Sequence, residues 1–257
     1  MNDFLATIGR SALGFFASVG RLFLFAGVSI SHIVRPPFYL KLVLRQMMLI
    51  GYNSLPVVGL TSLFTGMVLA LQSHTGFAGF GGDTAVAMLV VLSVTRELGP
   101  VIAGLMVAGR VGAAIAAELG TMSVTDQIAA LSTLSTNPYK YLVVPRILAG
   151  VITMPLLVIV ADIIGIMGGY IVAVYLLDAN PSSYLHLTWV ALKTPDVMSG
   201  LYKAAAFGFV VTLMGCYHGY HSRGGAQGVG SATTNAVVSG SILILLMDYL
   251  LTSVFFS

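Results

Sequence analysis

The chain has 257 residues, of which 57% are hydrophobic and 8% are charged, and its mean hydropathy is +0.95. A soluble protein of this length could not bury so much apolar surface, so the composition predicts an integral membrane protein. The 12 Lys and Arg residues against 9 Asp and Glu residues give a formal charge of +3, too small and scattered for nucleic-acid binding. Cys216 is the only cysteine, which excludes a disulfide within the chain.

The region 1–45 is apolar enough over residues 4–34 to resemble a membrane span, but it contains two arginines. Arg10 and Arg21 are eleven residues apart, and at about 100° per residue this spacing places them on nearly the same helix face. A helix with Arg21 near its middle fits the membrane interface better than the bilayer core. We therefore expect an interfacial amphipathic helix here, with a sixth span as the alternative.

Five further stretches are long and apolar enough to cross a bilayer, which requires about 20 residues. These stretches are 47–73, 84–108, 142–177, 204–220 and 232–256. The sequence therefore predicts an all-α polytopic membrane protein that forms a single domain, 1–257, with five transmembrane helices in the part 47–256.

Basic residues predict the orientation, because they gather on the cytoplasmic side. If the N-terminus is cytoplasmic, Lys193 is the only basic residue in an outer loop, and five spans then leave the C-terminus outside. The nine basic residues assigned to the cytoplasm are Arg10, Arg21, Arg35, Lys41, Arg45, Arg110, Lys140, Arg146 and Arg223. In the outer loop 178–200, Tyr184 and Trp189 predict a short helix that rests on the membrane interface.

The second span carries small residues at every fourth position, and these form one smooth ridge on a helix. Such a ridge lets another helix approach closely, either within the chain or across a dimer, and the spacing leaves both alternatives open. The residues are Gly104, Ala108, Gly112, Ala116 and Gly120.

The cytoplasmic loop between the second and third spans predicts a short amphipathic helix over 123–137. Ser123 and Asp126 have a spacing similar to a capping box, and Asn137-Pro138 would end the helix. Its apolar stripe would lie on lipid, on the chain's own spans, or in the groove of a soluble partner. The stripe consists of Ile128, Leu131 and Leu134.

Arg96 and Glu97 are adjacent charges about 18 Å along the second span, near the middle of the membrane. A charge there costs at least ~2.5 kcal/mol, and neighbouring positions point about 100° apart, so each needs a partner on another helix. We expect Glu97 to pair with Lys203, and Arg96 with Asp248. The alternatives are a charged pathway and a purely structural clamp; Pro100 predicts a bend nearby.

Catalytic motifs are absent from the sequence: it has no zinc-binding His-Glu-x-x-His, no Gly-x-Ser-x-Gly and no phosphate-binding Gly-Lys. We therefore expect no enzyme activity, no cofactor and no metal. Active transport would need a separate subunit that hydrolyses the nucleotide. The alternative is a proton-coupled secondary transporter in which Glu97 or Asp248 carries the proton, although no inverted repeat is evident.

Two segments of the chain are distinctive: "TRELGPVIAGLMVAGRVGAAIAAELGTMSVTDQIAAL" (95–131) and "NPYKYLVVPRILAG" (137–150). Together they resemble the core signature of the MlaE family, the permease subunits of ABC transporters that work with MCE-domain proteins in lipid trafficking. The resemblance implies that Arg96, Glu97, Lys203 and Asp248 line or brace a lipid cavity. It also implies that the helix near residue 126 couples to an ATPase; the coupling residues would be Glu118, Asp126, Gln127, Ile128, Leu131 and Leu134.

The resemblance further implies a homodimer in a bacterial inner membrane, with a periplasmic C-terminus. Its partners would be a cytoplasmic ATPase (MlaF-like), a STAS-domain protein (MlaB-like) and a periplasmic MCE ring (MlaD-like). The substrate would be a glycerophospholipid that is moved between the inner membrane and the MCE ring to maintain the lipid asymmetry of the outer membrane. The sequence departs from the family at Ser123, Asp126 and Ala129, where a basic, a Glu and an acidic residue are frequent.

Overall fold

The computed structural model describes residues 2–33, 35–77 and 82–256, and these residues form helices with no strand among them. The predicted all-α class is confirmed. In chain order the elements are α1 (Asn2–Ile33), α2 (Leu40–Ile50), η1 (Tyr52–Ser54), α3 (Leu55–Phe77), α4 (Gly82–Ser93), η2 (Val94–Leu98), α5 (Gly99–Val107), η3 (Ala108–Gly112), α6 (Ala113–Val124), α7 (Gln127–Thr133), η4 (Tyr139–Val143), α8 (Val144–Tyr175), α9 (Pro181–Ala191), α10 (Thr194–Tyr220) and α11 (Gly225–Phe256).

Six stretches of the described residues are helical, long and apolar enough to cross a membrane, one more than predicted. The additional stretch is Phe16–Ile33, which belongs to α1. The other five correspond to the predicted spans but begin or end further out, since helices continue beyond the apolar core as far as their backbone hydrogen bonds do. They are Leu40–Gly76, Val86–Val124, Tyr139–Tyr175, Thr194–Tyr220 and Gly225–Phe255.

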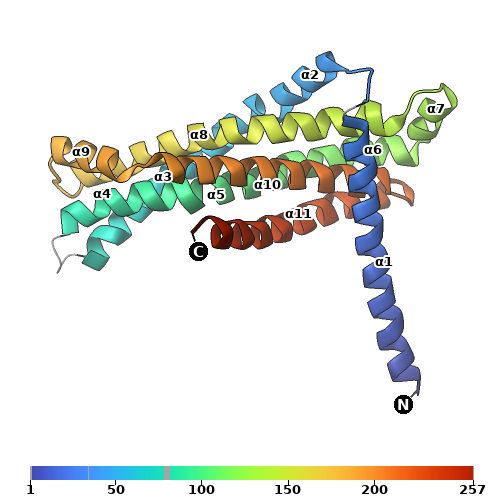
Figure 1. The fold of residues 1–257 in the computed structure, drawn as a ribbon, viewed down its shortest axis with the longest axis horizontal. Helices are drawn as coiled ribbons and strands as arrows, with labels where there is room; N and C mark the ends of the chain where they lie inside the picture. The colour runs from blue at the N-terminus through green and yellow to red at the C-terminus, as the bar shows by residue number, and fades with distance from the viewer. Residues whose placement is uncertain (1, 34, 78–81, 257) are drawn as a thin grey trace.

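Helix α1 crosses the end of the bundle steeply, whereas the other long helices run alongside one another (Figure 1). Its buried anchor is Phe25, which packs against a group of aromatic rings. Among the described side chains of α1, Leu13, Phe16, Phe23 and Leu24 are exposed, and the side chain of Arg10 lies outside the described residues. The orientation of α1 across the other long helices supports an interfacial position for it, and that position stays a prediction. The rings around Phe25 belong to Tyr139, Tyr217, Tyr220 and His221.

The centre of the bundle is built from close crossings between glycines. A Cβ at Gly208 of α10 would overlap the carbonyl of Gly150 on α8, and a Cβ at Gly66 of α3 would overlap the carbonyl of Gly165 on α8. Small residues therefore let α8 approach both α3 and α10 with backbone nearly touching backbone, which is how helices associate without a hydrophobic driving force in lipid.

The small-residue ridge of the second span packs within the chain. A Cβ at Gly104 would lie 3.2 Å from Phe207 on α10 and 3.5 Å from Ile244 on α11. At the other end of the ridge, Gly120 faces Ser222 and Val229 at similar distances. The ridge therefore seats α10 and α11, which favours the first of the two alternatives left open by the sequence.

The helix predicted over 123–137 is shorter in the structure, where α7 covers only Gln127–Thr133. Helix α6 continues to Val124, and Asp126 precedes α7 with a left-handed φ of 58° and no side-chain capping bond. The hydroxyl of Ser123 donates instead to the carbonyls of Tyr220 and Ser222. The proposed capping box is therefore wrong, because the chain makes a sharp turn at Asp126 where continuous helix was expected.

The loop 178–200, which is predicted to lie outside, contains the expected short helix, α9 (Pro181–Ala191). Its first turn is capped by Asn180, whose side-chain oxygen accepts hydrogen bonds from the backbone N–H groups of Ser182 and Ser183. Tyr184 is buried, and Trp189 is exposed. The position of α9 at the membrane interface stays a prediction.

Candidate functional site: a buried charge cluster

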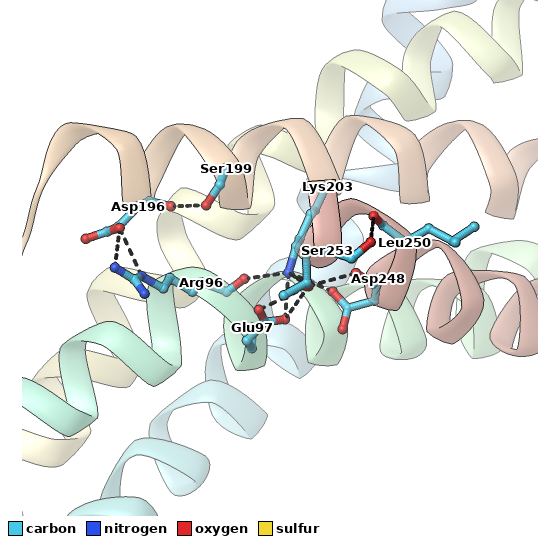
Figure 2. A network of polar contacts seen from close by, with 9 residues as sticks. Arg96, Glu97, Asp196, Ser199, Lys203, Asp248, Leu250 and Ser253 are labelled. Atoms are coloured by element: carbon cyan, nitrogen blue, oxygen red, sulfur yellow. Dashed lines mark hydrogen bonds and ion pairs between the residues drawn. The ribbon is translucent and has the colours of Figure 1, made fainter. Parts of the chain in front are cut away.

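Lys203 of α10 is fully buried and lies at the centre of a cluster formed by three membrane-spanning segments (Figure 2). Its ammonium donates to the Glu97 carboxylate at 2.6 Å, to the Thr252 hydroxyl at 2.7 Å and to the Arg96 carbonyl at 3.1 Å. These bonds use all three donors of the ammonium. The Asp248 carboxylate lies 3.0 Å away and adds a second negative charge.

The backbone around Arg96 leaves a carbonyl oxygen available to Lys203. Residues 94–98 form a π-helical turn, η2, followed by Pro100 near the start of α5. Proline has no N–H, so Pro100 cannot donate to the carbonyl of Arg96 four residues earlier. Lys203 binds this carbonyl instead, so the turn before Pro100 provides a ligand for the cluster, and the bend at Pro100 stays a prediction.

Two glycines allow the helices to approach this π-helical turn closely. A Cβ at Gly200 of α10 would overlap the carbonyl oxygen of Thr95, and a Cβ at Gly99 would overlap the carboxylate of Asp162 on α8. Asp162 is buried, and its Oδ1 has no hydrogen-bond partner within the described residues. The turn is therefore packed between α8 and α10.

The predicted pair of Glu97 with Lys203 is confirmed, but the predicted pair of Arg96 with Asp248 is wrong. The Arg96 guanidinium contacts Asp196 at 2.7 Å, whereas Asp248 contacts Lys203. Asp196 was assigned to the outer loop, but α10 begins at Thr194 and carries it into the bundle. A sequence signal exists, since Asp196 and Lys203 are seven residues apart and therefore share one helix face.

Thr252 is a second site residue that the sequence analysis missed. Its hydroxyl accepts a hydrogen bond from Lys203 and lies 3.2 Å from the Glu97 carboxylate and 2.8 Å from the carbonyl of Asp248. Its position four residues after Asp248 places it on the same face of α11. A threonine is too common in membrane helices for that spacing alone to have identified it.

The residues expected to couple to an ATPase fall into two groups. Ile128 is buried in the chain's own core and Leu131 packs against that core, so these residues follow the alternative in which the stripe lies on the protein's own spans. Leu134, Asp126 and Gln127 are exposed, and Glu118 forms an ion pair of 2.9 Å with the buried Arg146.

A cavity of about 570 Å³ lies between α7 and the turn that joins α10 to α11. Ala129 and Ser132 line it from α7, and Arg223 lines it from the turn.

The fold and the cluster define a polytopic α-helical membrane protein with buried ion pairs between its spans. Within the described residues, no group of three or more His, Cys, Asp or Glu side chains could hold a metal ion.

The family model described as Permease MlaE matches residues 43–254, and the chain belongs to this family. A protein of Rickettsia felis named "Probable ABC transporter permease protein" is 57% identical, over 97% of this chain and 96% of that protein. The "Intermembrane phospholipid transport system permease protein MlaE" of Haemophilus influenzae is 35% identical, over 99% of this chain and 98% of that protein. "Protein TRIGALACTOSYLDIACYLGLYCEROL 1, chloroplastic" of Arabidopsis thaliana is 33% identical, over 90% of this chain and 66% of that protein.

Proposed function

We propose that the chain is the permease subunit of an ABC transporter that moves glycerophospholipids between the inner membrane and a periplasmic MCE protein. A separate subunit hydrolyses ATP, and the transport maintains the lipid asymmetry of the outer membrane. The observation that carries this proposal is the Lys203 cluster, which places fixed charges among apolar spans where a lipid headgroup can meet them.

One side of the cluster is open. The Glu97 side chain is 37% exposed and that of Asp248 is 20% exposed, while Lys203 is fully buried. On both sides of Asp248, α11 presents an exposed apolar surface suited to acyl chains or to a second copy of the chain. This surface consists of Val238, Ile242, Leu245, Leu246, Tyr249 and Leu250. In the proposed homodimer, two such surfaces face each other and enclose the lipid.

The proposed topology places the N-terminus and α7 in the cytoplasm and the C-terminus in the periplasm. The ATPase (MlaF-like) then docks at the cavity beside α7, and a STAS-domain protein (MlaB-like) completes the cytoplasmic part. An MCE ring (MlaD-like) receives lipid on the other side. The relative in Haemophilus influenzae, named for intermembrane phospholipid transport, supports this assignment.

Neutralising one carboxylate at a time tests the role of the cluster. Glu97→Gln and Asp248→Asn each leave the other carboxylate to balance Lys203, so both variants should fold and assemble. We expect roughly ten-fold slower transfer of fluorescent phospholipid from proteoliposomes that contain the whole complex, equivalent to one charged hydrogen bond. Asp178→Asn, which removes an acid from the outer loop, is the control. Wild-type transfer in both variants contradicts the proposal.

Docking of the ATPase is tested by changing residues on the surface of α7. Ala129→Arg points into the cavity, whereas Ala130→Arg lies next to it on an exposed position that does not line it. We expect the first variant to lose a co-purifying ATPase and the second to keep it. If the purified chain instead moves phospholipid in liposomes under a proton gradient without any ATPase, the proton-coupled alternative replaces the ABC proposal.

A further inference from the structure

A long apolar groove runs between α2 and α8, away from the charge cluster. Figure 1 shows α2 next to α8 and at an oblique angle to it. The groove consists of two successive cavities of about 230 Å³ and 430 Å³. The first is lined by Val43 of α2 and by Leu148 of α8, and the second by Met48 of α2 and by Leu156 of α8.

The two cavities follow one another along the same pair of helices. Helix α8 contributes every fourth residue from Val144 through Leu148, Ile152 and Leu156 to Val160. This row spans roughly 24 Å at 1.5 Å per residue, which is more than half the thickness of the hydrocarbon core. The groove therefore reaches from one interface beyond the depth of one leaflet.

The end of the groove nearest α7 is positively charged. Lys140 lines the first cavity and donates to the carbonyl of Pro36, while Lys41 is exposed on the first turn of α2. Arg35 is exposed just before that turn. The sequence has no acidic residue between Asp3 and Asp83, and Glu118 is paired with Arg146. The charge at this end therefore favours an anion.

We propose that this groove binds an anionic phospholipid of the cytoplasmic leaflet. One acyl chain lies along the α8 row, and the phosphate lies between Lys41 and Lys140. Basic residues at the cytoplasmic end of an apolar groove between membrane helices are suited to such headgroups. This site shares no residue with the Lys203 cluster, so the inference does not depend on the proposed transport. It rests only on the proposed topology, which places this end of the groove in the cytoplasm.

Binding is measured on the full-length chain in detergent, with co-purifying subunits retained, as the rise in melting temperature on adding phosphatidylglycerol or phosphatidylcholine with the same acyl chains. We expect phosphatidylglycerol to stabilise the wild type at lower concentration. Lys41→Gln should weaken its apparent affinity roughly five-fold, from the loss of about one charge contact. Lys140→Gln is the second headgroup variant.

Filling the groove tests the acyl site separately. Leu156→Trp adds bulk at an exposed groove position, and Ile163→Trp adds the same bulk further along α8, beyond Val160, at an equally exposed position. We expect only the first to abolish stabilisation. Arg21→Gln removes an exposed basic charge from α1 that lines neither cavity and should change nothing. Equal stabilisation by both lipids, or equal losses in the variants and their controls, would overturn the proposal.

Discussion

Helices α10 and α11 follow one another in the chain and are both apolar, yet their surroundings differ sharply. In the most apolar 18-residue part of each helix, 61% of the residues of α10 are buried but only 11% of those of α11, although α11 is the more hydrophobic of the two. Hydropathy therefore does not report burial here, because lipid and protein interior are equally apolar. The two helices also differ at individual glycines: Gly208 of α10 lies against the backbone of α8, whereas Gly230 of α11 has open space around it.

The charged residues of the two helices also differ in burial. Lys203 belongs to the buried helix and has no access to solvent or lipid, while Asp248 belongs to the exposed helix and keeps part of its surface free. Buried charges need their partners more than exposed ones do. We therefore expect a comparable substitution to lower the stability of the protein more in α10 than in α11. Three experiments test this difference in surroundings.

The largest effect on stability is expected when the charge that α10 contributes to the cluster is removed. Lys203→Met leaves Glu97 and Asp248 as neighbouring negative charges and should lower the free energy of unfolding by about 3 kcal/mol, because buried partners lose their counter-charge. Asp248→Asn, the matched cut from α11, should cost about 1 kcal/mol or less, since Glu97 still balances Lys203. Unfolding in detergent followed by circular dichroism measures both. Equal costs would remove the distinction.

A smaller effect is expected from adding a methyl group to each helix. Gly208→Ala puts a Cβ into the carbonyl of Gly150 and 2.8 Å from Met154, so α8 and α10 must separate, at a cost of about 2 kcal/mol. Gly230→Ala meets nothing within 4 Å and should stabilise α11 by about 0.5 kcal/mol. Melting temperatures that shift in opposite directions confirm the comparison, and a shift in the same direction contradicts it.

The smallest effect on stability is expected at the exposed surface of α11. Leu246→Cys should change the free energy of unfolding by less than about 0.5 kcal/mol, as is usual for exposed positions. In the proposed homodimer it should form a disulfide between two copies under oxidising conditions. Leu156→Cys, equally exposed on α8, serves as the control. Cys216 is fully buried and gives no background. Crosslinking at α8 alone would place the dimer contact elsewhere.

The main features of the fold were predictable because they depend on local composition. Apolar length predicted the five spans, and the need to neutralise charge predicted the pair of Glu97 with Lys203. The partner of Arg96 was mispredicted because residues 178–200 were assigned to a loop. Pro195 and Asp196 in the first turn of α10 are a helix-start signal that the sequence analysis did not use. The turn at Asp126 depends on contacts between Ser123 and a distant loop, which no local pattern encodes.

One ligand of Lys203 is the main-chain carbonyl of Arg96. Mutagenesis that replaces side chains therefore does not remove this part of the site. Replacing Arg96 by any other amino acid removes the guanidinium and leaves the carbonyl in place. A complete scan of positions 96, 97, 203, 248 and 252 would therefore miss this ligand. A revealing substitution lies at Pro100, where any other amino acid returns an N–H that competes with the lysine for the same oxygen.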